Sequence, residues 1–91
     1  MQKFDSRIGV IELTAERYGH ITIFHPEIKS FHKHFGKTLI DPEIIRRSKS
    51  DPRVLIFYRK LSASKLLAIV VKTNARNFIL TAYFTNKIKN Q

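Results

Sequence analysis

The spacing of apolar residues changes near Asp41, and this change limits the folds that the chain can adopt. Three later segments are rich in β-branched and aromatic residues, with three residues between each and the next: RVLIFYRKL (53–61), KLLAIVVKT (65–73) and NFILTAYFT (77–85). Links this short suit hairpins, so we expect three antiparallel strands, with EIIRRS (43–48) as a short fourth strand. No helical segment separates these strands, which argues against a Rossmann or P-loop fold.

The residues before Asp41 show helical signals instead. Thr14 is a suitable N-cap residue for a first helix. The ring of Pro26 disfavours helical geometry at His25, so this helix should end near Phe24. A second helix is expected from Pro26 to about residue 39, because proline suits the first helical position. Its apolar residues recur along one side: Ile28, Phe31, Phe35 and Leu39.

Together these elements predict an α+β domain with the helices first and an antiparallel meander after them. The segment HITIF (20–24) stays open between helix and strand, because its β-branched residues suit both. A chain of 91 residues forms one domain, 1–91, and without cysteine it must hold its fold by its core alone. No apolar run approaches the ~20 residues of a membrane span, and no signal peptide begins the chain, so we expect a cytoplasmic protein with no membrane contact.

Positive charge is unevenly placed along the sequence. Seventeen Lys and Arg residues against seven Asp and Glu give a net charge of +10. All the acidic residues lie between Asp5 and Asp51, whereas the chain from Pro52 onward has eight basic residues and no acidic one, or +8. A field of one sign predicts a polyanionic partner such as RNA or DNA, with Lys87 and Lys89 as phosphate contacts. The alternative is a solvated lysine-rich surface.

The histidines do not have the spacing of a metal site. His20 and His25 are five residues apart, which places them about 140° apart around a helix and on opposite faces of a strand. His32 and His34 are two apart and point away from each other on a helix, as residues of a solvated face do. The sequence therefore predicts neither a metal nor another cofactor. RNA carries its own nucleophile, the 2′-hydroxyl, so cleavage needs only a base, an acid and a donor or cation at the phosphate.

Two clusters could supply these groups. On the first helix, Glu16, Arg17 and His20 stand at i, i+1 and i+4, so Glu16 can orient His20 and Arg17 lies one turn before it. Read alone, His20 is as well explained as an ordinary polar helix residue. In the last strand, alternation puts Ile79, Thr81, Tyr83 and Thr85 on one face and Phe78, Leu80, Ala82 and Phe84 on the other.

Further basic and aromatic residues belong to neighbouring strands of the expected sheet. Tyr58 and Arg59 end one strand, and Arg46 and Arg47 lie at the approach to it. Tyrosine can stack on a base and arginine can hold a phosphate, as on RNA-binding sheets. The competing explanation is that the tyrosines simply have a high strand propensity.

The succession IELTAERYGHI, HPEI, IDPEIIRRS, LIFYRK and ILTAYFTNKIK resembles the phage and bacterial nucleases grouped with barnase, EndoU, colicin tRNases and RelE (the BECR nucleases). The resemblance runs from about residue 11 to 89. It implies two N-terminal helices packed on an antiparallel sheet of about four strands, which favours the helical interpretation of HITIF. It also implies ribonuclease activity, with these residues at matching positions: Glu16, Arg17, His20, His25, Tyr58, Arg59, Thr81 and Tyr83.

The sequence departs from the BECR pattern at Phe24, where a basic residue often precedes HPE, so one candidate phosphate ligand is missing. The resemblance leaves open which residue acts as acid and which as base. The first functional hypothesis is a metal-independent endoribonuclease, a toxin or a phage-derived enzyme, that cuts tRNA or mRNA and is held by an acidic antitoxin or immunity protein. The alternative is a non-catalytic RNA- or DNA-binding module, or a partner-binding domain, on the same scaffold.

Overall fold

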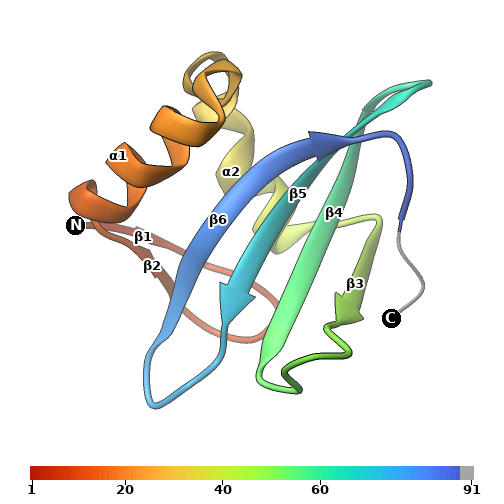
Figure 1. Cartoon of the computed structure of the whole chain (residues 1–91). Coiled ribbons are helices and arrows are strands. Elements are labelled where there is room, and N and C mark those ends of the chain that lie inside the picture. Colours follow the sequence, from red (N-terminus) through yellow and green to blue (C-terminus); the bar gives the residue numbers. More distant parts are fainter. Residues whose placement is uncertain (89–91) are drawn as a thin grey trace.

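The computed structural model describes residues 1–88, which build one six-stranded sheet with helical segments along one side (Figure 1). The helical segments are α1 (Ala15–Phe24), the 3-10 helix η1 (Pro26–His34) and α2 (Phe35–Ile40). The strands are β1 (Gln2–Phe4), β2 (Ile11–Leu13), β3 (Ile44–Arg47), β4 (Val54–Ser62), β5 (Lys65–Lys72) and β6 (Asn77–Thr85). Within residues 1–88 no helix has the length and apolar character needed to cross a bilayer.

The sheet is mixed, in the order β1-β2-β6-β5-β4-β3. β3 to β6 form the antiparallel meander, whereas β2 pairs in parallel with the start of β6, Ile11 opposite Asn77. β1 then pairs antiparallel with β2 and forms one edge of the sheet. The expected fold class, two N-terminal helices on an antiparallel sheet of about four strands, is therefore wrong. β1 and β2 have three residues each, too few to show a period of two in the sequence.

Several individual elements agree with the sequence predictions. β3, β4, β5 and β6 occupy the four segments expected to be strands. HITIF is helical as the second half of α1, and the side chain of Thr14 caps this helix by accepting a hydrogen bond from the Arg17 backbone N–H at 3.0 Å. His25 ends α1 with φ −135°, outside the helical region, as expected for a residue that precedes proline.

The expected single α-helix over 26–39 is wrong. A 3-10 helix runs from Pro26 to His34, beginning with a hydrogen bond from the Ile28 N–H to the His25 C=O at 3.0 Å, and α2 follows it directly. The spacing of the apolar residues accounts for this division. Ile28 and Phe31 are three apart, as three residues per turn require, whereas Phe31, Phe35 and Leu39 are four apart, as an α-helix prefers.

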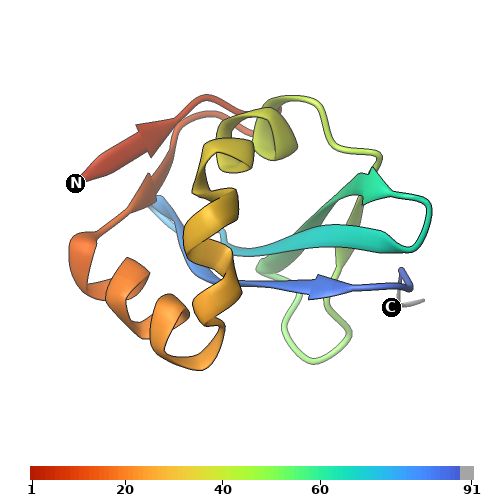
Figure 2. The same cartoon turned by 90° about the horizontal axis from the view of Figure 1, so that it is seen from above.

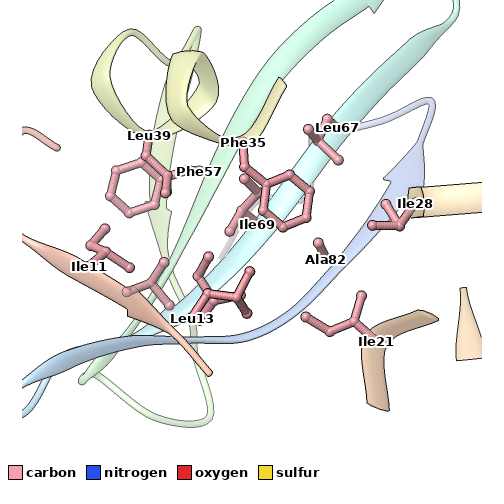
Figure 3. Packing of buried hydrophobic residues seen from close by; sticks show 12 residues of the cluster. Ile11, Leu13, Ile21, Ile28, Phe35, Leu39, Phe57, Leu67, Ile69 and Ala82 are labelled. Carbon is pink, nitrogen blue, oxygen red and sulfur yellow. The ribbon is translucent and has the colours of Figure 1, made fainter. Parts of the chain in front are cut away.

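The main core lies between the helical segments and one face of the sheet (Figure 3). Ile21 of α1, Ile28 of η1 and Phe35 at the start of α2 pack with sheet residues such as Ile69 and Ala82. Figure 2 shows the helical segments from above, with η1 passing beside the strands. We call the sheet face that carries Ile69 and Ala82 the inner face, and the opposite one the outer face.

A bulge in β6 alters which residues share a face. Val70 pairs with Thr81, but the next pair joins Val71 to Ile79, so Leu80 is the extra residue. Ile79 is consequently fully buried in the main core together with Ala82, and the expectation that Ile79 shares a face with Thr81 is wrong. The expected alternation holds from Thr81 onward.

Candidate functional site

The strand register brings the hydroxyl-bearing residues of the meander together on the outer face. Tyr58 and Tyr83 both pair with Ala68, so the three residues form one row across β4, β5 and β6. A second row joins Arg46, Ile56, Val70 and Thr81 across four strands. Directly paired residues project to the same side of a sheet, and Tyr58 and Ala68 belong to a small cluster separate from the main core.

Tyr58 is the most buried member of the outer face. Its side chain is 0% exposed, and Ile88, which follows β6, packs on its cluster. Thr85 helps to turn the chain there, because its Oγ1 donates to the Lys87 C=O at 3.1 Å and accepts from the Lys87 N–H at 3.3 Å. Within the described residues the Tyr58 hydroxyl has no hydrogen-bond partner. A substrate cannot touch this hydroxyl while the cluster is closed.

Tyr83 is half-buried beside Tyr58 and remains accessible. Burial, with a smaller contribution from the nearby Tyr58, raises the pKa of the Tyr83 hydroxyl above its ordinary value. Tyr58 is near enough to contribute, although the two hydroxyls lack the geometry of an ordinary hydrogen bond. A tyrosine hydroxyl is protonated at neutral pH, and a raised pKa does not change this, so Tyr83 can serve as a hydrogen-bond donor.

His25 meets Tyr83 at the edge of the sheet. Their ring centroids lie 6.2 Å apart with an interplanar angle of 37°. The His25 Nδ1 atom lies 3.8 Å from a carboxylate oxygen of Glu27. This arrangement follows from Pro26, which ends α1 and turns the His25 backbone away from the helix. The structure thus joins two of the residues selected from the sequence, from α1 and β6.

Arg17 and His20 lie on the side of α1 that adjoins the start of β6. Arg17, His20 and Phe24 are spaced i, i+3 and i+7 and so share one side of the helix. Arg17 lines a cavity of about 530 Å³ with Phe78 and Ile79 of β6. His20 is exposed on this side of the helix.

The same cavity contains the carboxylates nearest to Arg17. Its other lining residues are Glu12, Thr14, Glu16, Asn74, Ala75 and Arg76. Arg76 donates to Glu12 at 2.7 Å, so that glutamate is already paired, whereas the exposed Glu16 is within one turn of His20 as the sequence predicted.

The arginines selected from the sequence divide between the two faces. Arg46 lies on the outer face, and its Nε atom is buried without a hydrogen-bond partner within the described residues. Arg47 points away from it and donates to the Pro52 C=O. Arg59 donates to the Asp41 C=O at 2.7 Å. Arg47 and Arg59 are thus held by the protein itself and do not join Tyr58, Thr81 and Tyr83.

The fold brings much of the C-terminal positive charge against acids that precede Pro52. Of the seven basic residues described between Pro52 and residue 88, four are paired with carboxylates, namely Arg53 and Lys72 with Asp51, Arg59 with Asp41, and Arg76 with Glu12. Lys65 lies over the rings of Phe31 and Phe84, 4.8 and 4.3 Å from their centroids. Lys87 is exposed. Lys89 lies outside the described residues.

Three features of this region were not found by sequence reasoning. Ile88 covers Tyr58, Lys60 shares a cavity of about 350 Å³ with Ile88 at the end of the sheet, and Phe24 stands exposed beside His25. The alternation of β4 could have placed Lys60 on the face of Tyr58. Nothing local in the sequence indicates that the chain turns back after β6.

Within residues 1–88 no three His, Asp or Glu side chains gather where they could bind a metal ion. No family model, curated protein or solved structure gives a significant match to this chain. The molecule is therefore defined by its own geometry, an α+β domain with a mixed sheet and a basic, hydroxyl-bearing outer face. The resemblance to the BECR nucleases stays a prediction from the sequence segments.

Proposed function

We propose that this protein is a metal-independent endoribonuclease of the BECR type, acting at the edge of β6, where the end of α1 meets Tyr83 of the outer face. The observation that supports the proposal most is the contact between His25 and Tyr83, at a ring separation of 6.2 Å. It places an ionisable ring beside a protonated phenol. Arg17 and His20 on the adjoining side of α1, and Thr81 in the next row of the sheet, complete a set suited to a phosphodiester.

The proposed reaction is attack of the RNA 2′-oxygen on the adjacent phosphorus. One histidine, His20 or His25, accepts the proton of the 2′-hydroxyl as the new oxygen–phosphorus bond forms. The other, as imidazolium, gives a proton to the 5′-oxygen as its bond to phosphorus breaks. Tyr83 stabilises the charge that develops on the non-bridging oxygens. Arg17, about 12 Å from His25 along the axis of α1, contacts a neighbouring phosphate. The products are a 2′,3′-cyclic phosphate and a 5′-hydroxyl.

The remaining selected residues have supporting roles in this proposal. Tyr58 is a positioning residue, because it is fully buried and can act only through Tyr83. Arg46 lies three strands from Thr81, roughly 14 Å at ~4.8 Å per strand, and would contact a phosphate away from the cleaved one. Lys87 would extend the contact along the RNA, which as tRNA or mRNA would be met in the cytoplasm.

A toxin or phage-derived role follows from the same resemblance, and an acidic antitoxin or immunity protein would be its natural inhibitor. Such a partner would cover the outer face and neutralise Arg17, Arg46 and Lys87. Opposite charges on two surfaces speed association and fix its orientation.

One observation favours a second candidate, a non-catalytic RNA-binding domain. Tyr58 is closed off by Ile88, and the site has Phe24 where a basic residue often precedes HPE in the BECR pattern. Binding requires Arg17, Arg46 and an exposed ring, but it gives no role to a histidine beside a protonated tyrosine.

The two candidates are separated by incubating labelled single-stranded RNA with the protein in EDTA. We expect cleavage to a 2′,3′-cyclic phosphate, and no cleavage where the scissile nucleotide is 2′-deoxy. His20→Ala should lower the single-turnover rate by roughly 10²- to 10⁴-fold, as loss of a positioned acid or base does. His34→Ala is the matched control, since His34 lies on η1 beside Phe31. Binding without cleavage, or 5′-phosphate products, would refute the proposed reaction.

A further inference from the structure

Phe24 is exceptional among the phenylalanines of this protein. Its side chain is 75% exposed, whereas the other six are buried or half-buried. Within residues 1–88 its ring contacts no other ring. The Phe24 ring therefore contributes little to the core and is accessible to a ligand.

The position of Phe24 relates it to the groups of the proposed site. It is the last residue of α1, directly before His25, whose ring lies against Tyr83. It shares one side of α1 with Arg17 and His20 by the i, i+3, i+7 spacing. At 1.5 Å per residue, Arg17 and Phe24 are about 10 Å apart along the helix axis. A cation and an exposed ring thus flank His20 on a single surface.

We propose that Phe24 is a stacking platform for an unpaired nucleobase, and that it gives the site a preference for single-stranded RNA. This inference deepens the proposed function, on which it rests, by naming the form of the substrate. Bases stack on aromatic side chains irrespective of sequence, because every base has a π face. Bases in a duplex are already stacked on one another, so a platform of this kind selects strands whose bases are free.

Charge favours a nucleic acid over a protein as the occupant. The net charge of the chain is +10, and Arg17 and Arg46 have no carboxylate partner within the described residues. The neighbouring Ile23 is 74% exposed and provides an internal comparison. It lies about 100° from Phe24 and about 120° from Arg17 around the helix, on the other side of His20. A protein contact would use both residues, whereas a base would need the ring alone.

The test measures binding of an eight-nucleotide 2′-O-methyl RNA, which cannot be cleaved by 2′-oxygen attack, at fixed salt. One strand carries 2-aminopurine at its centre, and a second is abasic throughout. We expect Phe24→Leu to weaken binding of the first strand by about 5- to 150-fold, the range for one base–aromatic stack. It should change binding of the abasic strand less than twofold. Quenching of 2-aminopurine fluorescence should be lost with Phe24→Leu and kept with Phe24→Trp.

Ile23→Ala is the matched control and should bind both strands as the native protein does. Circular dichroism should give all variants the same melting temperature, since both side chains are exposed. Equal weakening of both strands, or native affinity in Phe24→Leu, would overturn this inference and leave the cleavage proposal standing. Self-association abolished by both Ile23→Ala and Phe24→Leu, with RNA binding unchanged, would overturn it in favour of a protein contact. If binding depends on the Phe24 ring but no RNA is cleaved, only the proposed nuclease activity would be refuted.

Discussion

At the scale of single residues, Tyr83 shows how a side chain gains a role from its surroundings. Thr81 and Tyr83 project from the same face of β6, but only Tyr83 meets a histidine and a second phenol. Like any tyrosine with an ordinary or raised pKa it keeps its proton throughout the neutral range, so it can donate to a phosphate oxygen. Its hydroxyl is thus suited to stabilise charge rather than to accept a proton.

We therefore expect Tyr83→Phe to lower the single-turnover rate of RNA cleavage by about 10²-fold, the cost of losing one hydrogen-bond donor at a developing anion. The melting temperature should change little, because the ring and its packing remain. Tyr18→Phe is the control. Tyr18, on α1, is also half-buried, but its ring lies beside His32, with 4.8 Å between the two centroids. A loss of rate in Tyr18→Phe as large as in Tyr83→Phe would assign the effect to the fold.

The sequence offered Tyr83, Thr81 and His20 as candidates through residue type and spacing, and these properties are local. It could not show that His25 would touch Tyr83, because that contact joins the end of α1 to the middle of β6. The interpretation of His32 as part of a solvated face is wrong. Its ring packs against Tyr18 and Phe35, and its Nε2 lies 2.7 Å from the Gln2 Oε1, a partner thirty residues away.

At the scale of elements, one carboxylate, that of Asp51, links the connection between β3 and β4 to β5. Asp51 accepts a hydrogen bond from the Lys72 Nζ at 2.6 Å and another from the Arg53 backbone N–H at 3.0 Å. The Lys72 hydrogen bond, followed by the Arg53 backbone bond, lowers the pKa of Asp51 to about 2. This carboxylate joins the turn to β5, the strand beyond β4.

Stability should therefore depend on the ionisation of Asp51. A lowered folded-state pKa contributes stability that is fully present above the unfolded value of ~3.9 and is lost as pH falls toward the folded value. We expect the urea midpoint of the native protein to fall between pH 5 and pH 2, and to fall less in Asp51→Asn. Asp5→Asn, which removes an exposed carboxylate near β1, should retain the native pH dependence. Parallel curves for native protein and Asp51→Asn would contradict this account.

The elements that could be predicted are those with a long local signal. β4, β5 and β6 have eight or nine residues each, with short links between them, and α1 has a capping threonine and a terminating proline. β1 and β2 could not be predicted, because three residues form a strand only when a partner is present. That partner, Asn77 opposite Ile11, lies far along the chain. A parallel pairing of this kind carries no turn signal in the sequence.

At the scale of the whole molecule, folding redistributes the charge. The sequence places all acidic residues before Pro52, but the fold sets Glu12, Asp41 and Asp51 against arginines and lysines that follow it. The +8 segment is thus a property of the sequence and not of one surface. A smaller group of cations lacks such partners: Arg46 and Lys60 on the outer face, Lys87 after β6, and Arg17 on α1 beside the start of β6. We call these four the outer-face cations.

These four cations set the expected salt dependence of RNA binding. None of them has a carboxylate partner within the described residues. Each phosphate neutralised on a single strand contributes ~0.7 to the slope of log K against log salt concentration, so all four together give about −3. Raising the salt concentration from 50 to 200 mM, roughly a fourfold range, should lower the affinity for the 2′-O-methyl strand by about 50-fold in binding titrations.

Single substitutions should show how much each cation contributes to the slope of log K against log salt concentration. Lys60→Ala should reduce its magnitude by about 0.7 and weaken all RNA sequences alike, because phosphate contacts carry no sequence information. Lys37→Ala removes the same charge from α2, among the helical segments beside the inner face, and should leave the slope unchanged. Equal changes in the two variants would mean that RNA responds to net charge and not to the outer face. A native slope near zero would exclude phosphate binding as the source of affinity, whatever the outcome of the cleavage assay.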